Sequence, residues 1–182
     1  SVGRRLIGYC CCILFLGGGW PVLLAAQEDP IVTNVEAINT PRSEYAPVYF
    51  GTDLVYVHQP LKGRYDLASK QNYFELFRAP LAGDRHKKGK RFIIEPKSAY
   101  HEGPVSFSKD GRQVFFTKTN AKAGVSQPAS SGEAKLKIYY AYQGQYDWTG
   151  VQELSINDDE RNTLHPSLSP DGNRLFFTSD RV

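Results

Sequence analysis

The 182-residue sequence predicts an all-β fold built from repeated antiparallel units. Three observations lead to this prediction: short runs of alternating apolar and polar residues, the dipeptide Asp-Gly between pairs of such runs, and the recurrence of this arrangement along the chain. With 41% hydrophobic and 23% charged residues, the composition is typical of a globular protein. It excludes intrinsic disorder as a description of the whole chain.

The first 26 residues predict a secretory signal. Arg4 and Arg5 precede an uncharged run that ends in small residues at Ala26, and polar residues begin at Gln27. This uncharged run is also long enough to span a bilayer, so an uncleaved anchor is the alternative, although three glycines and a proline weaken such a helix. All three cysteines lie inside this segment, so the mature chain has no thiols for disulfides or metal binding.

Two segments of the mature region are clearly similar to each other. Residues 103–117 and 164–178 each contain an alternating run, the dipeptide Asp-Gly and an aromatic run. This order predicts two antiparallel strands joined by a tight turn. A degenerate earlier copy lies at 46–57, so three β-hairpins are expected.

The Asp-Gly pairs are interpreted as structural. They are Asp110 with Gly111 and Asp171 with Gly172, and the two glycines are 61 positions apart. Asp-Gly readily takes a positive backbone φ, which a tight hairpin requires. We therefore assign these aspartates to turn formation rather than to catalysis.

Two further strands are expected after each complete hairpin. Aromatic runs at 74–79 and 137–142 predict a third strand, and runs at 91–95 and 151–156 predict a fourth. Residues 66–79 fit a helical face loosely, but their match to the second unit favours a loop and a strand.

Four strands in about sixty residues are typical of a β-propeller blade with long loops. The predicted organisation is a partial propeller of about two and a half blades. Residues 27–44 form an N-terminal segment whose run at 32–38 is the predicted ring-closing strand. Blade 1 covers 45–97, blade 2 covers 98–158, and 159–182 begin a truncated blade 3. Because propellers usually have four to eight blades, further blades are expected beyond Val182.

The second and third hairpins carry a family resemblance. Residues 165–181 (His-Pro-Ser-Leu-Ser-Pro-Asp-Gly onward) resemble the WD-like repeat of bacterial exported propellers of the TolB type, and 102–111 are a second copy. The longer stretch from Asp147 to Pro166 is similar to propellers that precede an OmpA-like domain in envelope proteins of Bacteroidetes-type bacteria. The resemblance implies an exported, noncatalytic propeller for binding or spacing, in the periplasm or at the outer membrane of a Gram-negative cell. It implies protein or peptidoglycan-associated partners and no cofactor.

Motifs for catalysis and metal binding are missing from the sequence. There is no Gly-x-Ser-x-Gly run to present a nucleophile, and the four histidines form no pair at zinc-site spacing. Residues 157–160 (Asn-Asp-Asp-Glu) offer oxygen ligands without the spacing of an EF-hand loop, so a solvated connection is preferred over a calcium site. We therefore assign no catalytic, cofactor-binding or metal-binding residue and expect no enzyme activity in this chain.

The densest charge run lies between the predicted third and fourth strands of the first unit. Its basic residues are Arg85, Lys87, Lys88, Lys90 and Arg91. A solvated hairpin loop is the plain interpretation, and contact with an anionic envelope polymer or lipid surface is the functional one. The net charge of +3 is too small to indicate a nucleic-acid-binding protein, so no nucleic-acid partner is expected.

The function expected from these observations is that of an envelope scaffold or binding module. The alternative is the accessory propeller of an exported serine peptidase whose catalytic domain lies beyond Val182. A sugar-acting propeller enzyme is disfavoured because spacing assigns no pair of acidic residues to one site. Residues 121–135, rich in Ala, Ser and Gly, are expected to form a flexible insertion.

Overall fold

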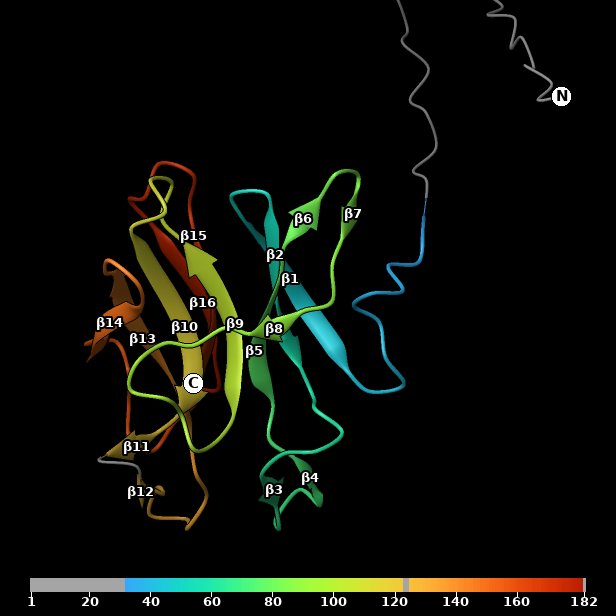
Figure 1. Ribbon diagram of the computed structural model, residues 1–182. Helices are drawn as coiled ribbons and strands as arrows, with labels where there is room; N and C mark the ends of the chain where they lie inside the picture. Colours follow the sequence, from blue (N-terminus) through green and yellow to red (C-terminus); the bar gives the residue numbers. More distant parts are fainter. Residues whose placement is uncertain (1–31, 123–124, 182) are drawn as a thin grey trace, which may run out of the picture. The chain divides into compact units, whose positions relative to one another are not determined.

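The structure is a computed structural model that describes residues 32–122 and 125–181. All regular structure in these residues is β-strand, and the strands pair in antiparallel sheets (Figure 1). The predicted all-β fold class is therefore confirmed. None of the described residues belongs to a helix that is long and apolar enough to cross a bilayer. The predicted signal at residues 1–26 lies outside the described residues.

Sheet 1 is a four-stranded antiparallel sheet in the order β1-β2-β5-β8. Its strands are β1 (Glu44–Phe50), β2 (Asp53–His58), β5 (Glu75–Ala79) and β8 (Lys90–Arg91). The expected hairpin at 46–57 and third strand at 74–79 are present as β1, β2 and β5. No helix forms at 66–79, because β5 instead pairs along the full edge of β2, from His58–Glu75 to Leu54–Ala79.

Sheet 2 repeats this arrangement in the order β9-β10-β13-β14. Its strands are β9 (Glu102–Phe107), β10 (Gln113–Thr119), β13 (Leu136–Gln143) and β14 (Trp148–Glu153). The third hairpin, β15 (Thr163–Leu168) with β16 (Leu175–Ser179), reproduces the register of β9 with β10. Figure 1 shows sheet 1 beside β9, with the third hairpin on the other side of β9.

Short hairpins extend the loops between the main strands. They are β3 (Tyr65–Asp66) with β4 (Gln71–Asn72), β6 (Leu81–Ala82) with β7 (Arg85–His86), and β11 (Ala121–Lys122) with β12 (Val125–Ser126). The expected flexible insertion at 121–135 therefore contains paired backbone. A further bridge joins Pro128 to Ala134, and Ala129 is buried.

Residues 32–38, where a ring-closing strand is predicted, form no strand in the structure, and the ring-closing pairing itself stays a prediction. These residues are irregular chain followed by a turn, in which the amides of Ile38 and Asn39 both donate to the carbonyl oxygen of Val35. A strand requires a neighbour that accepts its backbone hydrogen bonds, and no strand of the described residues lies alongside. Val35 and Ile38 instead pack on the outer face of sheet 1, where buried Ile38 contacts Tyr56 and Ala79.

The two predicted fourth strands differ from those observed. In place of 91–95, only Lys90 and Arg91 pair with β5, because the chain then turns into the space between the sheets. There Ile94 bridges Trp148, and the Glu95 amide donates to the Trp148 carbonyl oxygen at 2.9 Å. In place of 151–156, the strand is β14 at Trp148–Glu153, and its early start places the Trp148 ring in the core.

The main hydrophobic core lies between sheets 1 and 2. Sheet 1 and the chain after β8 contribute Val55, Val57, Leu76, Phe92 and Ile94, and sheet 2 contributes Val105, Val114, Phe116, Tyr139, Ala141 and Trp148. The Trp148 ring is 5.6 Å from both Phe50 and Phe107, centroid to centroid. Each sheet therefore buries one face against the other sheet.

The Asp-Gly turns have a shared hydrogen-bond pattern. In the second hairpin, the Ser108 hydroxyl donates to Asp110 Oδ1 at 2.6 Å, and the same carboxylate accepts the Arg112 amide at 3.0 Å. The Gly111 amide closes the turn on the Ser108 carbonyl oxygen. The hydrogen bond from Ser108, followed by that from Arg112, lowers the pKa of Asp110 below its ordinary value.

The third hairpin has the same turn. Ser169 donates to Asp171, Asp171 accepts the Asn173 amide, and the Gly172 amide closes the turn. Only the glycine of each pair has a positive φ, +69° at Gly111 and +74° at Gly172, while the aspartate acts through its carboxylate. The turn is therefore a longer loop built around a serine and an aspartate rather than a two-residue turn.

Replacing Gly111 by Ala is expected to lower the free energy of unfolding by about 1 to 2 kcal/mol, because a Cβ is strained at this positive φ. Urea unfolding followed by circular dichroism measures the change. Arg112→Ala, at the exposed neighbouring position, is the control and should differ little from wild type. An unchanged midpoint for Gly111→Ala would show that the turn does not hold this conformation.

Candidate functional site

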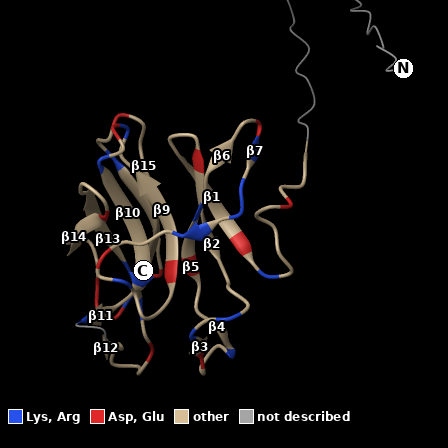
Figure 2. Ribbon diagram, viewed as in Figure 1, with Lys and Arg blue, Asp and Glu red and all other residues tan. Residues whose placement is uncertain are grey.

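The basic residues predicted to contact an anionic surface do not form one group. Arg85, Lys87, Lys88 and Lys90 are exposed along the chain from β7 to β8, coloured blue in Figure 2. Arg91 instead turns inward, where its guanidinium nitrogens lie 3.3 Å from Glu75 Oε1 and 3.7 Å from Glu102 Oε2. Its charge is therefore paired with carboxylates of the protein itself. Contact with an anionic surface stays a prediction for the other four basic residues.

Reversing two of these charges, as Lys87→Glu with Lys88→Glu, is expected to weaken binding to vesicles that contain an anionic phospholipid. The physical reason is the loss of screened, long-range attraction. Co-sedimentation at low and high salt measures it, with zwitterionic vesicles as the reference. The matched control is Lys109→Glu with Lys122→Glu, which changes the net charge equally at exposed positions elsewhere. Equal loss in both double variants would contradict a specific role for the loop.

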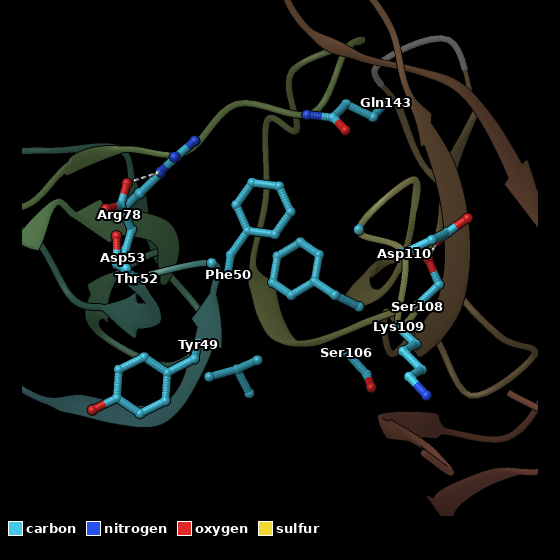
Figure 3. A pocket seen from close by; sticks show the side chains of 14 residues that line it. Tyr49, Phe50, Thr52, Asp53, Arg78, Ser106, Ser108, Lys109, Asp110 and Gln143 are labelled. Carbon is cyan, nitrogen blue, oxygen red and sulfur yellow. Dashed lines mark hydrogen bonds and ion pairs between the residues drawn. The ribbon is translucent and has the colours of Figure 1, made fainter. Parts of the chain in front are cut away.

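A hollow of about 670 Å³, which we call the turn-side hollow, lies beside the first two hairpin turns (Figure 3). The Phe50 ring stands in it, 4.6 Å from the Phe107 ring. Arg78 Nε donates to Asp53 Oδ2 at 2.6 Å, and its guanidinium lies 5.1 Å from the Phe50 ring centroid. Burial raises the pKa of Asp53, but the hydrogen bonds from Arg78 and the Leu81 amide, together with the charge of Arg78, outweigh it, so the pKa is lowered overall. These polar groups are already paired with one another.

A second hollow, of about 700 Å³, lies at the opposite ends of the same strands, and we call it the seam hollow. It is lined where the first strand of each unit begins, by Tyr45 of β1, Glu102 of β9 and His165 of β15. The loops after β2 and β10 complete it, with Asp66 and Ser126 among their lining residues. All three units therefore contribute side chains to this one space.

Aromatic rings form much of one wall of the seam hollow. The Tyr45 ring meets the Phe74 ring edge to face at 5.5 Å between centroids. The Tyr73 ring lies 4.6 Å from the His101 ring and 5.7 Å from the Tyr100 ring, both nearly perpendicular. Such a wall offers apolar faces and ring edges to a ligand.

His101 is held by its surroundings in a defined tautomer. Its Nδ1 accepts the Phe74 backbone amide at 3.2 Å, so the ring proton of the neutral form is on Nε2, which faces Asp66 Oδ2 at 3.6 Å. Burial lowers the pKa of His101, although Asp66 opposes this, and the ring is therefore mainly neutral at pH 7. Hydrogen bonds from Ser69 lower the pKa of Asp66, which stays ionised.

Glu102 is a buried carboxyl group in the wall of the seam hollow. It is 5% exposed, and its Oε2 accepts the Leu76 amide of β5 at 3.1 Å. Burial raises its pKa to about 7, against the opposing effects of this hydrogen bond and of Arg91. At neutral pH this carboxyl group is therefore about half protonated. It links the first strand of sheet 2 to the third strand of sheet 1.

A related link recurs one unit later. The Leu136 amide at the start of β13 donates to Asn162 Oδ1 at 2.9 Å, as the Phe74 amide before β5 donates to His101. His101 and Asn162 are again 61 positions apart. In both cases the residue before the next unit's first strand satisfies an amide of the third strand. Sequence reasoning missed this pair because a histidine and an asparagine share no motif.

His165 and the acidic segment 157–160 make structural contacts within the protein. His165 has a φ of +56° at the bulge of β15, and its amide donates to Thr117 Oγ1 at 3.0 Å. In residues 157–160, Asn157 binds the backbone of Ile138, Asp159 accepts from Lys137, and Glu160 accepts from Ser130. Within residues 32–122 and 125–181, no three His, Cys, Asp or Glu side chains gather as metal ligands would.

The sequence-predicted residues and the seam hollow do not coincide. Asp110 and Gly111 line the turn-side hollow of Figure 3. The side chains that converge at the seam are chiefly Tyr73, His101 and Glu102. Tyr73 and His101 lie just outside strands and Glu102 begins β9, and no sequence pattern gave these three side chains a functional role. Comparison of the chain with protein-family models, curated proteins and solved structures finds no match.

Proposed function

We propose that this protein is a noncatalytic binding module of the bacterial cell envelope, exported and built as part of a β-propeller of TolB-like repeats. The observation that carries the proposal is the repetition of one structural unit. Sheets 1 and 2 have the same strand order, and the second and third hairpins have the same register and turn. Units that pack face to face in this way form a rigid support for their loops.

The seam hollow is the proposed ligand site. Its lining comes from three successive units, so a ligand there contacts residues that only the packed units bring together. Aromatic rings supply contact area, and the His101–Asp66 pair and Glu102 supply hydrogen-bonding groups. This chemistry suits a protein segment or a peptidoglycan-associated partner.

Export is tested by expression in a Gram-negative host. We expect the full chain to appear in the periplasm or envelope fraction with Gln27 as its new N-terminal residue. Retention in the cytoplasm with an intact N-terminus would contradict export.

Binding is tested by co-sedimentation with purified peptidoglycan sacculi, with and without their attached proteins. Tyr45→Ala, which removes a wall of the seam hollow at a 39% exposed position, should reduce binding severalfold. Tyr146→Ala, at an 86% exposed position outside the seam hollow, is the control. No sedimentation in either preparation would reject this envelope partner.

A further inference from the structure

The seam hollow is lined by acidic side chains and lacks strongly basic ones. Its carboxyl groups belong to Asp66, Glu102 and Glu133, and none of the described residues that line it is lysine or arginine. His101, which faces Asp66, is mainly neutral at pH 7 because burial lowers its pKa. The charge of this lining therefore favours a cation over an anion.

Asp66 brings into the hollow a negative charge that is held by uncharged groups. Its Oδ1 accepts the Ala68 amide at 3.2 Å, and its Oδ2 accepts both the amide and the hydroxyl of Ser69. These hydrogen bonds lower the pKa of Asp66 and keep it ionised. Among the described residues, its ion-pair partner is the mainly neutral His101 ring, 3.6 Å from Oδ2. The carboxylate is therefore fixed in place without a cation beside it.

The other two carboxyl groups of the hollow have basic partners. An Arg91 nitrogen lies 3.7 Å from Glu102 Oε2, and Lys135 Nζ lies 2.8 Å from Glu133 Oε2. Neither of these basic residues lines the hollow. Asp66 is therefore the carboxylate of the hollow whose charge is left for a ligand.

Aromatic rings stand next to this carboxylate. The plane of the Tyr73 ring lies at 82° to that of Tyr100 and at 83° to that of His101. Rings set at right angles form adjoining walls, and aromatic faces attract ammonium and guanidinium groups. His101 joins the two features, because its Nε2 faces Asp66 and its ring packs on Tyr73. A carboxylate and an aromatic wall are thus presented to the same space.

We propose that the seam hollow binds a cationic side chain, lysine or arginine, of a protein segment, with Asp66 as the counter-ion and the Tyr73 ring as the aromatic wall. This inference rests on the proposed function, because it names the ligand of the same hollow. The volume of about 700 Å³ is that of a ligand pocket and leaves room for residues on either side of the basic one.

The test measures binding of the peptide acetyl-Gly-Lys-Gly-amide to the full chain by isothermal titration calorimetry. The matched peptide has norleucine in place of lysine, which keeps the four-carbon chain and removes the ammonium group. We expect the norleucine peptide to bind about tenfold more weakly than the lysine peptide. The corresponding arginine peptide should bind, and the glutamate peptide should not.

Variants of the protein locate the bound cation. Asp66→Asn keeps an oxygen for the Ser69 amide but removes the charge, so it should weaken binding of the lysine peptide about tenfold. Asp84→Asn removes the same charge at an exposed position outside the hollow and is the matched control. Tyr73→Leu should also weaken binding, whereas Tyr73→Phe keeps the ring and should bind as wild type does. This second pair gives a result even if Asp66→Asn loosens its loop.

Three results would overturn the proposal: equal binding of the lysine and norleucine peptides, no binding of either, or equal losses in Asp66→Asn and Asp84→Asn. None of them rejects the proposed function, which is tested separately by sedimentation with sacculi. If Tyr45→Ala lowers that sedimentation while the peptides fail to bind, the hollow remains the ligand site and only its cationic ligand is rejected.

Discussion

Glu102→Gln is expected to increase the free energy of unfolding at pH 8 by up to about 3 kcal/mol and at pH 5 by less than about 1 kcal/mol. The pKa of Glu102 rises from 4.5 to about 7 in the folded protein, chiefly through burial. The folded state therefore binds this proton more tightly than the unfolded state does. Stability from this group is present below pH 4.5 and is lost as the pH rises toward 7. Glutamine keeps an oxygen for the Leu76 amide but carries no charge.

Chemical denaturation between pH 5 and 8 measures the difference between variant and wild type. The comparison uses the variant minus wild type, because His101 also makes the stability of both proteins depend on pH. The lowered pKa of His101 destabilises the fold as the pH falls below 6.5, which is opposite to the effect of Glu102. Glu133→Gln is the control. Lys135 lowers the pKa of that exposed carboxylate, so Glu133 changes its charge only below pH 4.5 and the variant should show no change in pH dependence between pH 5 and 8. Parallel curves for Glu102→Gln and wild type would show that Glu102 is ionised without cost.

Trp148→Ala is expected to lower the free energy of unfolding by about 3 to 5 kcal/mol. The ring is 5% exposed and lies 5.6 Å from Phe50 and Phe107 and 6.1 Å from Phe92. Its removal leaves a cavity where sheets 1 and 2 meet, and this core cannot close without moving a sheet. Urea unfolding measures the loss.

Two further variants make the Trp148 result interpretable. Trp148→Phe keeps an aromatic ring and should lose less stability than Trp148→Ala, so it gives a measurable value even if the alanine variant does not fold. Tyr146→Ala removes an 86% exposed ring two positions away and should change stability by less than about 0.5 kcal/mol. Equal stability of Trp148→Ala and wild type would contradict a core between the sheets.

Local patterns in the sequence predicted the hairpins well. The alternation around Asp110-Gly111 and Asp171-Gly172 identified β9 with β10 and β15 with β16, because hairpin pairing depends on residues close in the chain. The third strands β5 and β13 were also found, since their aromatic runs lie within one unit. Residues 32–38 form no strand in the structure, because Val35 and Ile38 pack on sheet 1 without backbone pairing.

The candidate site was much less predictable than the strands. The sequence placed Arg91 with the exposed basic residues, but the approach of Glu75 and Glu102 from other segments pairs its charge. It also gave no signal for Glu102, whose raised pKa follows from burial between two sheets. Burial and pairing of this kind depend on contacts between distant segments, which no local motif records.

The sequence by itself therefore determined the all-β class, the repeat of 61 residues and the position of each Asp-Gly turn, because these depend on local alternation and on the φ that glycine allows. Only the tertiary structure decided that Trp148 fills the core and that His101, Glu102 and Tyr73 meet at one hollow. The physical reason is that each of these outcomes is set by how one unit packs against the next.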